Sequence, residues 1–447
     1  MKTINEFGIY VPEILLPKKI DLKSWSVIAC DQYTQNIDYW KKAEETAGSN
    51  PSTLNLILPE IYLNSPDKPE RIEKINRTMK EYLDDGVFSN PINSFIYIER
   101  TSQFGRTRKG LLCLIDLETY EWKPMTTANI RATEATIVER IPPRMEIRRN
   151  ACLELPHIML LANDKSRSLV EACGEAVKSS GARPLYEGEL MCNGGSIKGW
   201  AVIEDELIKN AVNKIAEENK QADGSTVLFA GGDGNHSLAT AKAIWAEKKR
   251  ELQKAGASEE KLQNDRARFA LVEIVNIYDE GLTFEPIHRV LFNADSEKLM
   301  THLEEKLHGK IREITGGSAK KELSDLVKNS TASFGFIFQE NGKQKYFILE
   351  TEIKELGISH LQPALDDFIK TENQKLTNQI EIDYIHGTED VIALGKKDDT
   401  LAMLLPPIAK ESFFDTIGKT GPLPRKSFSM GEADEKRFYL ECRKVVD

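Results

Sequence analysis

The chain has 447 residues, and its 60 lysines and arginines against 70 aspartates and glutamates give a formal net charge of −10. This acidic balance argues against general nucleic-acid binding, which needs a basic surface. No apolar run approaches the ~20 residues that span a bilayer, and the first 20 residues lack the apolar core of a signal peptide. The scattered cysteines form no CxxC pair, so we expect free thiols and a cytoplasmic location.

Hydrophobic periodicity predicts helices and a long hairpin in the first part of the chain. Apolar residues recur at helical spacing in 69–83, at Ile72, Ile75, Met79 and Leu83, so this segment is expected to form an amphipathic helix. The other expected elements are a polar helix over 34–47, a helix capped by Ser52 or Thr53, and strands over 94–99 and 110–116 that pair as a hairpin.

The remainder of the chain alternates strands and helices. Asn341-Gly342 is a strong turn signal and predicts a hairpin between 334–338 and 345–349. The other expected elements are strands over 226–230, 269–277, 382–385, 391–394 and 401–405, and a helix from Ser237 to about Lys254. This mixture favours an α+β fold of mixed sheets with hairpins. Boundaries after residues 141 and 300 would give three regions, 1–141, 142–300 and 301–447.

A glycine-rich segment between a predicted strand and a predicted helix is the strongest local feature. Gly231, Gly232 and Gly234 allow backbone N–H groups to approach a ligand closely. The start of the following helix, with Ser237 as the expected N-cap, is suited to binding an anion. The segment fits neither the Walker A pattern nor the G-x-G-x-x-G fingerprint, so a standard P-loop or Rossmann enzyme is disfavoured.

Three polar side chains accompany these glycines. Asp233 is a candidate Mg²⁺ ligand or base, and His236 is a candidate phosphate ligand or proton donor, with Asn235 between them. The alternative is a tight turn before a capped helix. The combination of glycines with three polar groups favours a phosphate-binding loop.

A second cluster precedes this segment in the chain. Arg131 is a candidate bidentate clamp for phosphate or carboxylate, and Glu134 is a candidate general base. A solvated, charged edge is the alternative interpretation. Cys30, next to Asp31, is either a reactive thiol or, as is commoner for free cysteine, a small buried apolar group.

Two later segments also carry cations. His288 and Arg289 follow a proline and are candidate anion ligands, and a surface pair or a core histidine is the alternative. Arg425 and Lys426 lie in a loop stiffened by prolines and are further candidate phosphate ligands, with a solvated basic stretch as the alternative. The remaining histidines, His157 among them, are expected to be structural.

Six separated motifs in this order resemble a bacterial and archaeal family catalogued as domain of unknown function 1015. The motifs are WSVIACDQY at 25–33, RATEAT at 131–136, LPHIML at 155–160, GDGNHS at 232–237, PIHRV at 286–290 and LPRKS at 423–427.

The resemblance implies a ParB/sulfiredoxin-like core with flanking α/β segments, in which a loop at a helix start binds nucleotide phosphates. A relative in that superfamily is an archaeal kinase that phosphorylates free serine with ADP. The central loop of the family usually reads D-G-H-H-R, whereas here Asn235 stands at the first His and Ser237 at the Arg. Loss of that Arg removes a bidentate phosphate ligand unless Arg289, Arg425 or Lys426 replaces it.

By this resemblance, the expected function is phosphotransfer on free serine or phosphoserine with ATP or ADP and Mg²⁺. The loop would cradle phosphates, Asp233 would hold Mg²⁺, His236 and Arg131 would neutralise charge, and Glu134 would take the serine proton. A phosphoserine phosphatase-like hydrolase and a non-catalytic nucleotide-binding regulatory module remain alternatives. The expected partner is a small molecule, with neither membrane nor nucleic acid involved.

Overall fold

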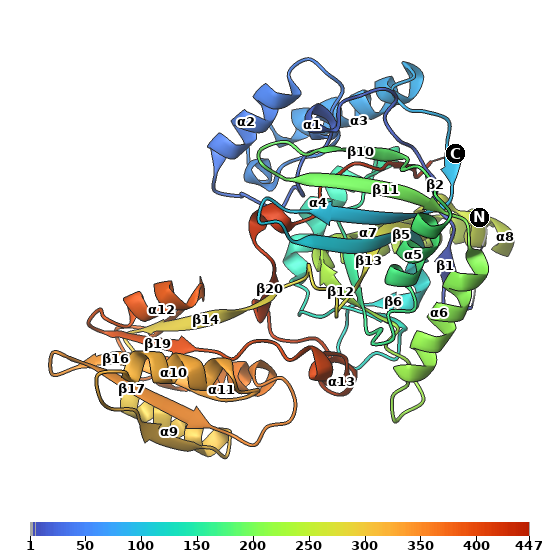
Figure 1. The fold of residues 1–447 in the computed structure, drawn as a ribbon. Helices are drawn as coiled ribbons and strands as arrows, with labels where there is room; N and C mark the ends of the chain where they lie inside the picture. Colours follow the sequence, from blue (N-terminus) through green and yellow to red (C-terminus); the bar gives the residue numbers. More distant parts are fainter. Residues whose placement is uncertain (1–2, 5, 447) are drawn as a thin grey trace. The chain divides into compact units, whose positions relative to one another are not determined.

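The computed structural model describes residues 3–4 and 6–446. Residues 1, 2, 5 and 447 lie outside the described residues, and the first three of them belong to the N-terminal segment considered above for a signal peptide. The chain forms two compact units (Figure 1). Unit 1 contains the residues up to 282 and those from 431 onward, and unit 2 contains residues 283–430.

A mixed sheet of ten strands forms the centre of unit 1. Nine strands follow in the order β10 (Tyr186–Glu189), β11 (Ser196–Val202), β4 (Phe95–Thr101), β5 (Thr107–Asp116), β13 (Phe269–Asn276), β9 (Met159–Ala162), β12 (Phe229–Asp233), β7 (Ile130–Arg131) and β6 (Tyr120–Glu121), and β1 (Ile9–Tyr10) also pairs with β5. The pairs β13–β9, β12–β7 and β6–β7 are parallel, and the other described pairs of this sheet are antiparallel. The expected α+β class is confirmed.

The sheet has an apolar core on each face because side chains alternate along its strands. In β4, Phe95 and Tyr97 pack into one core, while Ile96 and Ile98 pack into the other. The first core includes residues of α5 (Val170–Ser179), α6 (Asp205–Glu218) and α7 (Asn235–Lys254). The second includes residues of α1 (Leu22–Trp25), α2 (Ile37–Ala47) and α3 (Lys68–Asp84), together with residues 438–442.

Several expected elements of unit 1 are confirmed. The helices over 34–47 and 69–83 are α2 and α3, and the long hairpin is β4–β5. Ser52 caps a short 3-10 helix, Thr53–Leu56, by accepting a hydrogen bond from the N–H of Leu54. The strand expected over 269–277 is β13.

The glycine-rich segment differs from expectation in two ways. The strand predicted over 226–230 begins later and continues through Gly231 and Asp233, because these residues extend the ladder with β9. The predicted N-cap, Ser237, is wrong: the N-cap of α7 is Gly234, so Ser237 already lies in the first helical turn. A glycine at this position accepts the left-handed backbone that starts the helix.

Unit 2 is built on a second, antiparallel sheet. Six of its strands follow in the order β15 (Lys310–Glu313), β17 (Lys343–Glu350), β16 (Phe334–Glu340), β19 (Thr400–Leu404), β14 (Phe284–Phe292) and β18 (Glu381–His386), and β20 (Phe428–Met430) also pairs with β14. The described helices of this unit are α9 (Ser296–Lys306), α10 (Ala319–Lys328), α11 (Ile358–Asn373), α12 (Thr388–Leu394) and α13 (Lys410–Thr420).

The β16–β17 hairpin confirms the Asn-Gly turn signal, since Asn341 and Gly342 have φ angles of 51° and 71°. The strand expected over 391–394 is wrong, because these residues end α12. Glu389 and Asp390 occupy the first turn of this helix, where acidic side chains are favourable. A run of four apolar residues fits either a strand or a buried helix, and here Val391 and Ile392 are buried on a helix.

Buried ion pairs hold residues 431–446 in unit 1. The Nε of Arg437 donates to Oε2 of Glu273 in β13 at 2.6 Å, and its Nη2 donates to Oε2 of Glu441 at 2.9 Å. All three side chains are at most 3% exposed. Burial tends to raise the pKa of Glu273, but the charges of Arg108 and Arg437 outweigh it, so this pKa lies below its usual range.

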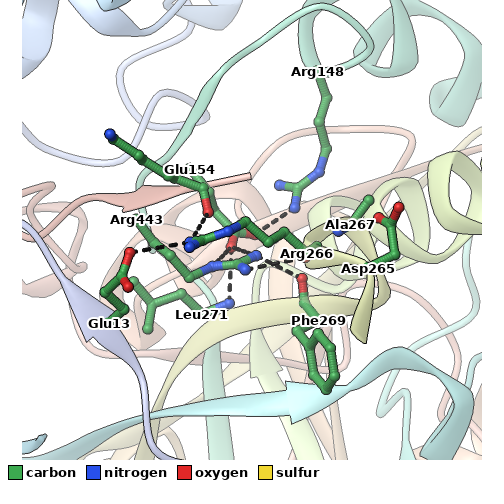
Figure 2. Close-up of polar contacts among 10 residues, drawn as sticks. Glu13, Arg148, Glu154, Asp265, Arg266, Ala267, Phe269, Leu271 and Arg443 are labelled. Carbon is green, nitrogen blue, oxygen red and sulfur yellow. Dashed lines mark hydrogen bonds and ion pairs between the residues drawn. The ribbon is translucent and has the colours of Figure 1, made fainter. Parts of the chain in front are cut away.

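A second buried pair lies further along the same segment (Figure 2). Arg443 in β21 (Arg443–Lys444) donates from Nε and Nη2 to Oε2 of Glu154 in β8 (Leu153–Glu154), at 2.9 and 2.6 Å. Its remaining donors reach the carbonyl oxygens of Arg266 and Phe269. Arg148 pairs with the other oxygen of Glu154. Because these charges are paired and hydrogen-bonded, the interior of unit 1 tolerates them.

We expect Arg437→Met to lower the free energy of unfolding of unit 1 by ~3–5 kcal/mol, because it removes one partner of buried charges. All 5 tryptophans lie in the sequence of unit 1, so tryptophan fluorescence in urea follows this unit. Arg77→Met is the control, since Arg77 and Glu81 form an exposed pair at 3.8 Å and its loss should cost less than ~1 kcal/mol. Equal losses in the two variants would contradict the role given to Arg437.

Candidate functional site

The sheet topology gathers several segments at the carboxyl end of β12. We call residues 231–237, where β12 ends and α7 begins, the β12–α7 junction. Asp233 pairs with Met159 at the start of the antiparallel strand β9, so the residues that precede β9 lie beside the junction. Ala230 pairs with Arg131 of the parallel strand β7, so the residues that follow β7 leave the sheet at the same end.

The two ends of unit 1 also meet here. The N–H of Ala29 donates to the carbonyl of Arg437 at 2.9 Å, and the N–H of Tyr439 donates to the carbonyl of Val27 at 2.8 Å. This pairing sets Cys30 next to Tyr439. Lys436 forms an ion pair with Asp233 of the junction at 3.5 Å. A residue of the C-terminal segment thus supplies positive charge to the junction.

The junction leaves the start of α7 without a side-chain cap. Gly234 has a φ of 76°, and an added Cβ would lie 3.1 Å from the Cα of Ile158, so both conformation and space favour glycine. Its N–H donates to Oδ1 of Asp233 at 2.9 Å. The first amides of an α-helix have no carbonyl partner in a preceding turn, and they suit an anion.

Asn235 holds the segment that follows β7 against the junction. Its Nδ2 donates to Oγ1 of Thr133 at 3.3 Å, and its Oδ1 accepts from the N–H of Thr133 at 3.4 Å. The Thr133 hydroxyl in turn donates to the carbonyl of Gly231. A Cβ on Gly231 would lie 2.3 Å from Oδ1 of Asn235, so this arrangement requires glycine. Glu134 follows Thr133 directly and is half-buried.

His236 is a neutral hydrogen-bond donor at pH 7. Its pKa is lowered to about 4, mainly by burial and also by the charges of Arg144 and Arg140, while Asp31 opposes the shift. Its Nε2 accepts a hydrogen bond from the N–H of Ile137 at 3.2 Å, so the proton of the neutral ring is on Nδ1. A ring in this state offers one N–H to an anion.

Ser237 contacts a histidine that the sequence suggested to be structural. Its Oγ lies 2.8 Å from Nε2 of His157, and Nδ1 of the same ring lies 3.0 Å from the hydroxyl of Tyr439. The N–H of Cys30 donates to that hydroxyl at 3.3 Å. These residues come from four separate stretches of the chain.

A cavity of about 140 Å³ adjoins this chain of contacts. Its polar lining includes Cys30, Glu60, Arg144, His157 and Ser237, and the rest of the lining is largely apolar. Arg144 pairs with Glu60, so a cation and a carboxylate both border the cavity. Burial raises the pKa of the Cys30 thiol, and the charges of Asp31 and Glu60 raise it further, so Cys30 is protonated at neutral pH.

The Arg131 side chain makes its hydrogen bonds away from the β12–α7 junction. It is buried, and its guanidinium donates to the carbonyl of Ala128 and to Oγ of Ser225, each at 2.9 Å. Burial lowers its pKa, and Asp223 opposes the shift. These contacts tie β7 to the loop before β12.

The other four candidate ligands lie in unit 2, and two of them, Arg289 and Lys426, lie close to Tyr384. The Arg289 guanidinium lies 4.5 Å and Nζ of Lys426 4.9 Å from the centroid of this ring. Nδ1 of buried His288 accepts from the N–H of Leu405 at 3.1 Å, and burial lowers its pKa to about 4. Arg425 and Lys426 are exposed.

The donors at the junction suit a magnesium ion that keeps most of its ligands as water and phosphate. Among residues 3–4 and 6–446, no group of three or more His, Cys, Asp or Glu side chains is placed to hold a metal. Asp233 offers one carboxylate, and Mg²⁺ commonly takes only one or two from the protein together with substrate phosphates. In the described part of the chain, no helix is both long and apolar enough to cross a membrane.

Comparison with known proteins identifies the family. The family model described as "Protein of unknown function (DUF1015)" matches residues 14–368. The chain belongs to this family. The expected family is thereby confirmed, and a search of curated proteins found no match.

Several solved structures are similar to this DUF1015 chain. A conserved hypothetical protein from Pyrococcus furiosus is 13% identical, with a TM-score of 0.35 and coverage of 73% of this chain and 96% of that one. A free serine kinase in complex with AMP is 11% identical, with a TM-score of 0.36 and coverage of 73% and 93%. SbnI with a C-terminal truncation, from Staphylococcus aureus, is 9% identical, with a TM-score of 0.32 and coverage of 69% and 82%.

Sequence reasoning missed four charged or polar groups at this site. Asp31 and Glu60 precede the glycine-rich segment by well over a hundred residues, and Lys436 follows it by about two hundred. His157 was assigned a structural role. The antiparallel pairing of β9 with β12 explains the position of His157, but a single sequence carries no direct signal for that pairing.

We expect NMR of ¹³C-labelled histidine to give His236 a pKa of about 4. Arg144→Met should raise this pKa because it removes a neighbouring positive charge, and Asp31→Asn should lower it because it removes a negative one. Arg77→Met, on the exposed face of α3, should leave it unchanged. An unchanged pKa in Arg144→Met would show that Arg144 does not act on the ring.

The same pKa predicts how unit 1 responds to acid. Because the folded pKa lies below the ordinary value of 6.5, the unfolded chain binds more protons between these two values. The contribution of His236 to the free energy of unfolding is therefore complete above pH ~6.5 and is lost as pH falls toward 4. Urea unfolding followed by tryptophan fluorescence should show that the free energy of unfolding falls less steeply over this pH range in His236→Gln than in wild type. An identical slope would contradict the prediction.

Proposed function

We propose that this protein is a phosphotransferase that acts on free serine or phosphoserine, with ATP or ADP as the nucleotide. One observation carries the proposal: the uncapped start of the 20-residue helix α7 lies together with Asp233, Lys436 and neutral His236. Phosphoryl transfer depends mainly on positioning and on stabilising negative charge, and this set of groups supplies both. The serine and nucleotide assignments rest on the family resemblance.

In this proposal the backbone of the β12–α7 junction binds phosphate. The backbone N–H groups of Asn235, His236 and Ser237 lie at the N-terminal end of α7, where the helix dipole is positive. Lys436 and Arg144 add positive charge near the junction, and Nδ1 of His236 adds a neutral donor. Arg131 holds β7 against the loop before β12. His288, Arg289, Arg425 and Lys426 are proposed ligands of a phosphate in unit 2.

Two carboxylates complete the proposed site. Asp233 would hold Mg²⁺, which when bound neutralises charge on the phosphates. Its present partner, Lys436, would then be released toward the phosphates. Glu134, held beside the junction through its neighbour Thr133, would take the proton of the serine hydroxyl.

The decisive experiment mixes the full chain with L-serine, Mg²⁺ and either ATP, ADP or pyrophosphate. Mass spectrometry should detect phosphoserine with one donor, and phosphoserine with the spent donor should give the reverse reaction. The kinase proposal fails if no donor yields phosphoserine and no nucleotide shifts the Tm. Phosphate release from phosphoserine without nucleotide would indicate the hydrolase. A nucleotide that shifts the Tm without turnover would indicate the regulatory module.

Asp233→Asn should lower kcat about 10²-fold or more, because it removes a charged group at the reacting phosphates. Asp223→Asn is the matched control, since Asp223 lies in the loop before β12 and bonds to Ser225. The control should keep the wild-type rate. Equal rates in the two variants would remove Asp233 from the site.

A further inference from the structure

We propose that Ser237 is a nucleophile that becomes phosphorylated during the reaction, with His157 as its base and Tyr439 as the positioning residue. This inference rests on the proposed function and adds a covalent step to it. It assigns a role to a group of side chains that the phosphate-binding roles above leave unused. The contacts of the histidine ring carry the argument.

The first step concerns the orientation of the His157 ring. Nε2 lies 2.8 Å from Oγ of Ser237, within the range of a strong hydrogen bond, and Nδ1 lies 3.0 Å from the hydroxyl of Tyr439. Both nitrogens are therefore engaged, and His157 is 8% exposed. A hydroxyl, a histidine and a third group that orients the histidine form the arrangement that activates serine nucleophiles.

The second step concerns the protons. Burial raises the pKa of Tyr439 well above its usual value, so its hydroxyl keeps its proton. That hydroxyl also bonds to Cys30, through both the N–H and the thiol of this residue. With the thiol as acceptor for Tyr439, Nδ1–H of His157 can donate to the phenol oxygen. Nε2 is then the acceptor for the hydroxyl of Ser237, as a base requires.

The third step concerns room for a phosphoryl group. Ser237 and His157 both line the cavity of about 140 Å³, a volume well above the ~30 Å³ that one water occupies in the liquid. Arg144, in its ion pair with Glu60, borders the same cavity. Ser237 lies in the first turn of α7, so unpaired helix amides are close to its Oγ. A serine that merely completes a structural hydrogen bond would need no cavity beside its hydroxyl.

The reaction then has two balanced halves. Oγ of Ser237 attacks the terminal phosphorus of the nucleotide, the bond from that phosphorus to the bridging oxygen breaks, and the hydroxyl proton moves to Nε2 of His157. The shortened nucleotide leaves with the bridging oxygen. The hydroxyl of the acceptor then attacks the same phosphorus, the Oγ–phosphorus bond breaks, and Oγ recovers a proton from His157. The proton of the acceptor goes to Glu134.

The test incubates the full chain with Mg²⁺ and either ATP or ADP, without serine. The quenched protein is then examined by peptide mass spectrometry. We expect one added phosphoryl group on Ser237 that disappears when serine is supplied. Ser237→Ala should abolish the adduct, and His157→Gln should lower its rate of formation about 10²-fold. Ser179→Ala, at the exposed end of α5, is the matched control and should behave as wild type.

Tyr439→Phe separates positioning from packing, because it keeps the ring and removes only the hydroxyl. If Tyr439 orients His157, this variant shifts the pH profile of adduct formation while its thermal unfolding stays close to wild type. A purely structural tyrosine would leave the pH profile unchanged.

The outcomes distinguish this inference from the proposed function. Phosphoserine formation by wild type without any adduct on Ser237, or at an undiminished rate in Ser237→Ala, overturns the inference and leaves the kinase proposal standing. An adduct on Ser237 that no serine removes supports the nucleophile and overturns serine as the acceptor. If neither phosphoserine nor an adduct on Ser237 forms with any nucleotide, both the inference and the proposed function are overturned.

Discussion

The interior of unit 1 depends on a buried arginine that the chain supplies near its end. Arg437 neutralises Glu273 at the centre of the sheet and Glu441 in its own segment, and none of the three charges has ready access to water. An isolated carboxylate in this position would be very costly. Arg108 also pairs with Glu273 at 3.3 Å, so residues 431–446 supply the second of the two cations that neutralise this carboxylate. The same contact sets the flanking residues Lys436 and Tyr439 where they meet the β12–α7 junction.

Strand direction explains how the remaining groups come together. Because β12 is antiparallel to β9 and parallel to β7, one edge of the sheet receives the approach to β9 and the exit from β7. His157 comes from the first, and Thr133 with Glu134 from the second. The junction itself contributes backbone amides rather than a large set of charged side chains. The charged side chains reach the junction from other segments of the chain. This arrangement agrees with an acidic protein that concentrates a few cations at one place.

Local sequence signals were sufficient wherever the structure follows from neighbouring residues. The apolar stripe of α3, the Asn341-Gly342 turn and the strand β13 were all predicted from periodicity and turn chemistry. The signal failed where tertiary contacts decide: Gly231 to Asp233 look like a loop but extend a strand, and Val391 to Leu394 look like a strand but end a helix. For the site, the junction was predicted, whereas Asp31, Glu60, His157 and Lys436 depend on long-range pairing that one sequence does not display.

The interruption of unit 1 by unit 2 has a consequence for the order of synthesis. A ribosome makes the sheet strands of unit 1 first, then all of residues 283–430, and only afterwards Lys436, Arg437 and Tyr439. Until then Glu273 lacks Arg437, His157 lacks its phenol partner and Asp233 lacks its lysine. The nascent chain consequently passes through a stage in which unit 2 is already made and the junction is still incomplete. Completion of the site thus requires residues 431–446, so a chain that stops before them carries no assembled junction.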